Sequence, residues 1–234
     1  MAAIDNNVVL EHVLKDWAID FEITPDILSL AKAMSANRAI LTGAYRSMLT
    51  KQTSFKIKPL FSEEYRFNFD YEARLVKISQ GETRVGLSID QLRLLLGKVD
   101  AATSPIYSLG SIVKLNDAML PDGLLDLAQL SDESHGLVSI TGRKLQLIEP
   151  FNKYVVDYIA TAWPIGGQVG EQPMMVSNMM IDSIVFKGFS NPDEEAFTDA
   201  LHAAQIEAQQ ISTAFMSGDD QSEFMKEASS KSKN

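Results

Sequence analysis

The 234-residue chain is 45% hydrophobic and 22% charged, which is enough to bury a core in one large domain or two small ones. Its formal net charge of -10 disfavours general binding to nucleic acids or anionic membranes, because neutralising phosphate groups requires a basic surface. The absence of cysteine excludes disulfide bonds and thiolate metal sites.

The first 50 residues have the spacing of helices. Apolar residues from Leu10 to Phe21 recur at intervals of three and four, which places them on one face of a first helix. Thr24-Pro25-Asp26 then provides a cap, a first-turn proline and an acidic first turn for a second helix that runs to Met48. We predict a helical hairpin that packs on itself or on the following sheet, with a hairpin that docks a partner protein as the alternative.

Between residues 51 and 102 the apolar period changes to two. Phe67, Phe69 and Tyr71 alternate with polar residues, which predicts antiparallel strands with one face in water. Ser88 and Gln91 form a capping-box signal for a helix after the last strand.

Basic residues in this segment are interleaved with aromatic ones, as on platforms that bind single-stranded nucleic acids. The basic residues are Lys56, Lys58 and Arg66. Acidic neighbours cancel their charge, so we do not expect a nucleic-acid site; these neighbours are Glu63, Glu64, Asp70 and Glu72.

From residue 103 onward, strand and turn signals alternate. We expect a strand at 109–115, a hairpin at 137–147 that turns at Thr141-Gly142-Arg143, a central strand at 154–163 and a last strand at 183–189. Asn191, Pro192 and the acidic residues after them then predict a helix start, since they supply a cap, a first-position proline and charges that suit the helix dipole.

Short motifs in this region resemble a known family. They are Gly110-Ser111-Ile112-Val113, Ile140-Thr141-Gly142-Arg143, Val156-Asp157-Tyr158 followed by Trp163-Pro164-Ile165-Gly166, and Ile184 to Phe189 before the acidic helix start. Together they resemble a small uncharacterised domain family of Gram-positive type VII secretion gene clusters, encoded beside LXG-type toxins that carry an N-terminal helical secretion domain. The resemblance covers residues 107–201 and brings no catalytic residues with it.

Two apolar features are candidates for partner contacts. Leu124, Leu125 and Leu127 lie in an acidic insertion between 116 and 136, where they either contact a partner or cover the local core. Phe197, Leu201, Ile211 and Phe215 belong to a heptad-spaced seam on the predicted C-terminal helix. This seam docks on its own sheet, or its distal half pairs with a helix of another protein.

Catalytic patterns are missing from the sequence. The three histidines, His12, His135 and His202, have no chelating spacing, and neither a nucleophile elbow nor a phosphate-binding loop occurs. Asp157 stands in an apolar strand, where we expect it to pair with a cation such as Arg143 or Lys144; a functional carboxylate is the alternative. We therefore expect no enzyme, no cofactor and no metal.

These observations predict an α+β protein with a helical hairpin at 1–50, an antiparallel sheet plus helix at 51–102, a sheet domain with a C-terminal helix at 103–217 and a flexible tail at 218–234. The chain lacks a signal-peptide pattern and an apolar run of about 18 residues, so we expect a cytoplasmic location and no membrane partner.

The resemblance implies a chaperone or adaptor that binds a type VII toxin, with the toxin's helical secretion domain as the expected partner, and keeps it export-competent. Alternatives are an immunity protein that neutralises the toxin domain, and a viral or phage assembly component.

Overall fold

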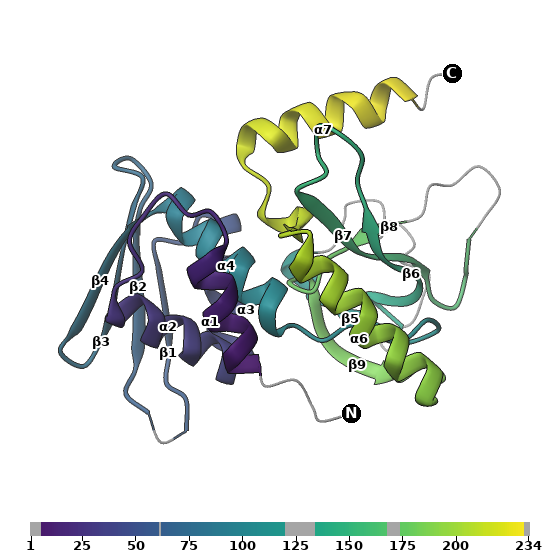
Figure 1. Cartoon of the computed structure of the whole chain (residues 1–234), viewed down its shortest axis with the longest axis horizontal. Helices are drawn as coiled ribbons and strands as arrows, with labels where there is room; N and C mark the ends of the chain where they lie inside the picture. The colour runs from purple at the N-terminus through teal and green to yellow at the C-terminus, as the bar shows by residue number, and fades with distance from the viewer. Residues whose placement is uncertain (1–5, 61, 120–133, 168–173, 232–234) are drawn as a thin grey trace. The chain divides into compact units, whose positions relative to one another are not determined.

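The computed structural model describes residues 6–60, 62–119, 134–167 and 174–231 (Figure 1). The chain divides into two compact units, residues 1–104 and 105–234. Each unit combines helices with a mainly antiparallel sheet, which confirms the predicted α+β class.

The N-terminal unit begins with three helices, α1 (Asn6–Asp16), α2 (Pro25–Ala36) and α3 (Arg38–Leu49). The Thr24 side chain caps α2 by accepting a hydrogen bond from the backbone N–H of Ile27 at 3.3 Å. The predicted helical region is thus confirmed, but its second helix is divided. Asn37 has an extended backbone, and its side chain accepts a hydrogen bond from the N–H of Ala39, so it starts α3 as a new helix.

Four strands follow and form an antiparallel sheet in the order β1-β2-β3-β4, as the alternating pattern predicts. Their bounds are β1 (Ser54–Ile57), β2 (Tyr65–Asp70), β3 (Leu75–Gln80) and β4 (Thr83–Ser88). The capping box is confirmed at the start of α4 (Ile89–Thr103), where Ser88 and Gln91 exchange hydrogen bonds of 2.9 and 3.1 Å. The helices cover one face of the sheet, so the apolar side chains of its strands point into a core with α4 (Figure 1).

The C-terminal unit contains a six-stranded sheet in the order β10-β7-β6-β5-β9, with β8 paired to β7. Its strands are β5 (Ile112–Leu115), β6 (Leu137–Gln146), β7 (Tyr154–Ala162), β8 (Met174–Val176), β9 (Ile181–Phe186) and β10 (Ile211–Ser212). The pairing is antiparallel except between β10 and β7. Val113, Val138 and Tyr158 belong to the buried cluster on one face of this sheet.

The hairpin predicted around Gly142 is wrong, because β6 is a single strand. Its pairing with β7 shifts register between Ile140 and Gly142, which is a β-bulge. A Cβ atom at Gly142 would lie 3.2 Å from the Cβ of Ile159. Glycine is therefore required here for a close approach of two strands, and not for a chain reversal.

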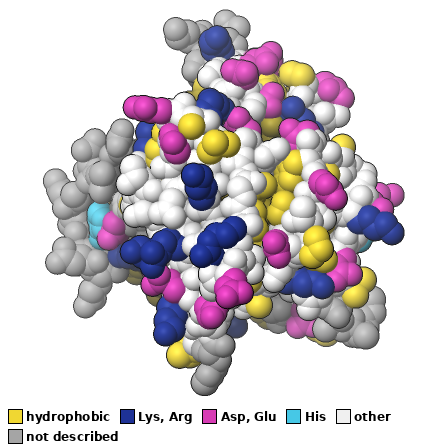
Figure 2. All heavy atoms as spheres, turned by 90° about the vertical axis from the view of Figure 1, so that its left-hand side faces the viewer, with side chains coloured by type: hydrophobic (Ala, Val, Ile, Leu, Met, Phe, Trp, Pro, Cys, Tyr) yellow, Lys and Arg dark blue, Asp and Glu magenta, His cyan; other side chains and the backbone are white. Residues whose placement is uncertain are grey.

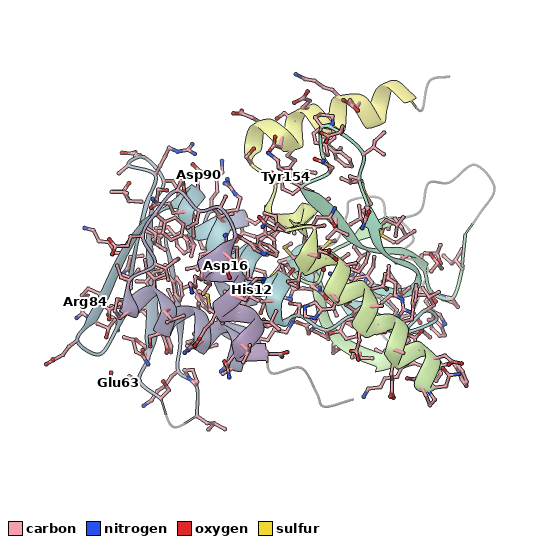
Figure 3. The ribbon with its side chains drawn as sticks, in the orientation of Figure 1. His12, Asp16, Glu63, Arg84, Asp90 and Tyr154 are labelled. Atoms are coloured by element: carbon pink, nitrogen blue, oxygen red, sulfur yellow. The ribbon has the colours of Figure 1, made fainter. Side chains whose placement is uncertain are left out.

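The region after β9 differs most from the prediction. The first helix, α6 (Pro192–Glu207), ends well before Phe215, and a second helix, α7 (Gly218–Lys231), lies where we predict a flexible tail. Side-chain contacts connect α7 to the sheet domain. Tyr154, labelled in Figure 3, donates a hydrogen bond of 2.5 Å to Asp220, and the rings of Phe151 and Phe224 meet edge to face. A polar segment is thus helical because a few contacts stabilise it.

Candidate partner-binding surface

The last strand of the C-terminal sheet, β9, lies at its edge. It pairs with β5 on one side, and no described strand pairs with its other side. Only Ile181 of β9 is buried, while Val185 is 59% exposed and Phe186 is 58% exposed. Apolar side chains on an edge strand of this kind mark either a binding surface or an aggregation hazard.

The chain after β9 continues this apolar exposure on a fixed backbone. Gly188 donates a backbone hydrogen bond to the Ser111 hydroxyl at 3.0 Å, and a Cβ atom at Gly188 would lie only 2.2 Å from the carbonyl oxygen of Leu109. This close packing fixes the backbone just before Phe189, whose side chain is 79% exposed, against the backbone of the exposed Leu109. The exposed ring of Phe189 therefore belongs to a segment whose backbone is held by these contacts.

The first turns of α6 bring a further aromatic ring to the same region. The Asn191 side chain accepts a hydrogen bond from the N–H of Glu194, and Pro192 occupies the first turn, which confirms the predicted helix start. Arg143 of β6 pairs with Glu194, donates a hydrogen bond to Thr198 and lies over the ring of Phe197 at 5.3 Å. Phe197 is nevertheless 56% exposed, so its ring is positioned without being covered.

Electrostatics strengthen this attachment of α6. The Arg143 side chain is almost completely buried, and the hydrogen bonds that it donates hold the pKa of Glu194 below the ordinary value. Ser108, the neighbour of Leu109, contributes a further hydrogen bond to Glu194. These contacts place Leu109 and Phe197 in one region. We call the exposed side chains of Leu109, Val185, Phe186, Phe189 and Phe197 the β9–α6 surface, in which the consecutive residues Val185 and Phe186 point to opposite faces of the edge strand.

The predicted heptad seam is not a continuous helical face. Phe197 and Leu201 lie on α6, exposed and half-buried respectively, but Ile211 pairs with Tyr154 in the sheet and Phe215 is buried in a 3-10 turn (Thr213–Phe215). The helix ends because the chain turns at Gln209, whose φ is +52°. Two buried glutamines fix this turn: Gln205 donates to the carbonyl of Gln210, and Gln210 donates to that of Asn152.

The helix ends before Ile211 because the apolar seam is too weak to stabilise a longer one. The seam positions between Leu201 and Ile211 are the alanines Ala204 and Ala208, so a straight helix would bury little apolar surface along this stretch. Adding Ile211 to the edge of β7 buries its side chain partly and pairs its backbone. The other predicted contact residues, Leu124, Leu125 and Leu127, lie outside the described residues.

Sequence reasoning missed most of the β9–α6 surface. The apolar run from Ile184 to Phe189 predicts a strand, but the pattern does not tell whether a second strand or layer covers it. Phe197 is the one member of the surface that the spacing singles out. The remaining members are visible only after the order of the strands is known.

A separate polar cluster surrounds Asp157, which is completely buried on β7. Lys144 donates to one carboxylate oxygen at 2.8 Å, and the Ser212 hydroxyl and the backbone N–H of Asn178 donate to the other at 2.6 and 3.0 Å. Of the two cations expected near Asp157, Lys144 is the partner, while Arg143 binds Glu194. These bonds connect β6, β7, β10 and the segment that follows β8, which favours a structural role.

Other kinds of site have little support within the described part of the chain. No group of three His, Cys, Asp or Glu side chains there could hold a metal ion. None of the described helices combines the length and the apolar character needed to cross a lipid bilayer.

The comparisons with known proteins concern the middle of the C-terminal unit. Residues 127–197 match a family model described as Domain of unknown function (DUF4176). No curated protein and no solved structure matches the chain. The matched region is less than a third of the chain, and it contains β6 to β9 and the start of α6. The resemblance to an uncharacterised domain family is confirmed to this extent, and the match assigns no activity.

Proposed function

We propose that this protein is a chaperone or adaptor that covers an apolar segment of another protein with its β9–α6 surface. The observation that carries the proposal is the set of three phenylalanines, Phe186, Phe189 and Phe197, each more than half exposed on backbone that hydrogen bonds and packing hold in place. Burying one such ring in an interface is worth about 2 kcal/mol or more.

The partner that we propose is an LXG-type toxin of a type VII secretion system, bound in the cytoplasm before export. The support is the resemblance of residues 107–201 to a family of those gene clusters, together with the apolar surface in the same region. A secretion domain made of amphipathic helices has apolar stripes whose exposure to water is unfavourable. Covering them would keep the toxin soluble and export-competent.

A second candidate, an immunity protein, is favoured by the charge distribution. Residues 105–234 contain 18 Asp and Glu against 8 Lys and Arg, which accounts for the whole net charge of -10. An acidic surface of this kind is complementary to a basic toxin domain such as a nuclease. The two candidates differ in the toxin domain that is bound.

Co-purification tests the proposal. The full chain is expressed with an LXG-type toxin divided into its helical secretion domain and its catalytic domain. We expect capture by the secretion domain, and a Phe189→Ser/Phe197→Ser variant should lose at least tenfold in affinity. A Val8→Ser/Ile148→Ser variant removes two equally exposed apolar side chains elsewhere and should bind normally. Capture only by the catalytic domain would support the immunity protein and overturn the chaperone.

A further inference from the structure

The N-terminal unit differs from the whole chain in charge. Residues 1–104 contain 13 Lys and Arg and 13 Asp and Glu, so this unit is formally neutral in a protein of net charge -10. Its charges are not evenly spread over the sheet. On the face turned away from the helices, four basic residues alternate with small polar ones, and they are Lys56, Arg66, Lys77 and Arg84.

The strand register places these residues close together. Lys56 is directly opposite Arg66, Arg66 is opposite Ser79, and Ser79 is opposite Arg84, so the three charges form a row across the sheet. Lys77 lies on β3 two residues before Ser79, one row away. Figure 2, which faces this side, shows several Lys and Arg side chains near one another with acidic side chains around them, and Figure 3 labels Arg84 at the outer side of the sheet.

The acidic side chains of this face lie at the ends of its strands and in its turns, so the row of cations itself stays basic. Glu64 pairs with Arg66 at 2.7 Å, and Lys56 and Lys58 also act on it, so that its pKa lies below the ordinary value mainly because of the hydrogen bond from Arg66. Asp70 lies at the far end of β2, where it accepts a hydrogen bond from the N–H of Ala73. Glu63 lies against Gly81 in the β3–β4 turn, and Glu82 belongs to the same turn, so these carboxylates border the row of cations at one end.

Fold stability does not explain this arrangement. Two like charges directly opposite on neighbouring strands, such as Lys56 and Arg66, destabilise a sheet. The space beside Lys77, at Gly86 of the neighbouring strand, is open, since a Cβ atom at Gly86 would meet nothing within 4 Å. A ligand with several negative charges would fit this space and relieve the repulsion.

We propose that the outer face of the β1–β4 sheet is a docking surface for a carboxylate-rich segment of a protein partner. A nucleic acid fits less well, because bases stack on exposed aromatic rings and those of this sheet, such as Phe67 and Phe69, are buried against the helices. A membrane surface fits less well too, because the chain as a whole carries a charge of -10. This surface lies on the other unit from the β9–α6 surface and does not depend on the function proposed for it.

Fluorescence anisotropy with three probes tests the proposal on the full chain. The probes are a labelled 12-residue peptide of Glu-Glu-Ala repeats, a labelled dT12 oligonucleotide and vesicles that contain phosphatidylserine. We expect the peptide to bind most tightly, and its affinity to fall as salt is raised from 50 to 300 mM, since exposed charges are screened over about 8–10 Å. Tighter binding of dT12 or of vesicles, or no peptide binding at low salt, would overturn the proposal.

Matched variants locate the binding surface. Lys56→Gln/Lys77→Gln removes two charges from the face and should weaken peptide binding about tenfold, as expected for two surface charge contacts. Lys15→Gln/Lys32→Gln removes the same charge from α1 and α2 and should change the affinity less than twofold. All four positions lie at the surface, so circular dichroism should show intact folds. Equal peptide affinities of the two variants would show that binding depends only on the total charge of the protein. That result would overturn the proposed binding surface.

Discussion

Lys144 and Asp157 form an ion pair of 2.8 Å whose two side chains are almost completely enclosed by protein. The lysine has a left-handed backbone with φ of +49°, a conformation that costs free energy in a non-glycine residue. Its neighbours Arg143 and Leu145 pair with Tyr158 and Val156, which places Lys144 across from the aspartate. The strained backbone is therefore combined with the one contact that neutralises a buried carboxylate.

We predict that Lys144→Met destabilises the C-terminal unit by about 3–5 kcal/mol, because the substitution leaves Asp157 charged and buried without its cation. Chemical denaturation, followed by tryptophan fluorescence and circular dichroism, measures this loss. The matched control is Lys153→Met, which removes an ion pair with Asp220 from the surface and should cost less than about 1 kcal/mol. Similar losses for both variants would contradict a special role of the buried pair.

A second lysine, Lys98, is also buried, in the N-terminal unit. It donates a hydrogen bond to the carbonyl of Trp17 at 3.1 Å and lies over the Trp17 ring, and burial lowers its pKa from 10.5 to about 8. A shift of this size corresponds to about 3 kcal/mol, since each unit is worth 1.36 kcal/mol. Lys98→Met should therefore stabilise the N-terminal unit at pH 7, by about 1–3 kcal/mol once the lost contacts are included.

The pH dependence gives an independent measurement of the same lysine. Because its pKa is lower in the folded state, the unfolded chain binds more protons between pH 8 and 10.5. The stability of the wild type should thus increase across this range, and the gain disappears as the pH falls to 8. Lys98→Met should lack this increase, so the difference between the two proteins should shrink with rising pH. A constant difference would show that Lys98 titrates normally.

We expect Arg143→Ala to loosen α6 without unfolding the sheet. The substitution removes the hydrogen bonds to Glu194 and Thr198 and the contact with the Phe197 ring, so hydrogen exchange should accelerate across residues 192–207. Since Glu194 has a lowered pKa, the ion pair stabilises above the unfolded pKa of a glutamate and is lost as the pH falls through the folded pKa. Exchange in the wild type should therefore approach that of the variant in acid, and unchanged exchange at neutral pH would contradict this account.

Two glycine substitutions separate close packing from general flexibility. Gly188→Ala places a Cβ atom 2.2 Å from a backbone oxygen of Leu109, so it should cost about 1–3 kcal/mol and displace Phe189. Gly86→Ala meets nothing within 4 Å and should be neutral or slightly stabilising, because alanine restricts the unfolded chain. Thermal unfolding of both variants measures the contrast. A neutral Gly188→Ala would mean that the segment before Phe189 moves freely.

The sequence predicts those elements whose signals are local. The alternation from Phe67 to Tyr71, the Ser88–Gln91 capping box and the Asn191 cap each depend on residues within a few positions, and all three occur in the structure. Gly142 and Ile211 have the same local signals as a turn and a helix seam. In the structure Gly142 lies in a β-bulge and Ile211 lies in a parallel strand. Both roles depend on pairing with β7, which is distant in sequence from Ile211.

The exposure of the candidate surface also depends on contacts between residues that are distant in sequence, so it could not be predicted from local patterns. An apolar strand such as β9 predicts burial, and its exposure follows from its place at the end of the strand order. Asp157 was predictable as a paired carboxylate because an aspartate in an apolar strand requires a cation. Which of two adjacent cations it takes depends on the bulge at Gly142, which determines where Arg143 and Lys144 lie opposite β7.

The parallel pairing of Ile211 with Tyr154 also determines when this unit can form during synthesis. Ser212 supplies one of the three donors to Asp157, and it is 55 positions further along the chain. A ribosome that has released β5 to β9 therefore exposes a chain in which the buried carboxylate is still incompletely bonded and the first residues of β7 lack their β10 partner. We therefore expect the unit to complete its folding only after residues 205–212 have emerged, and chains that end before Ser212 to be selectively lost to proteolysis in the cell.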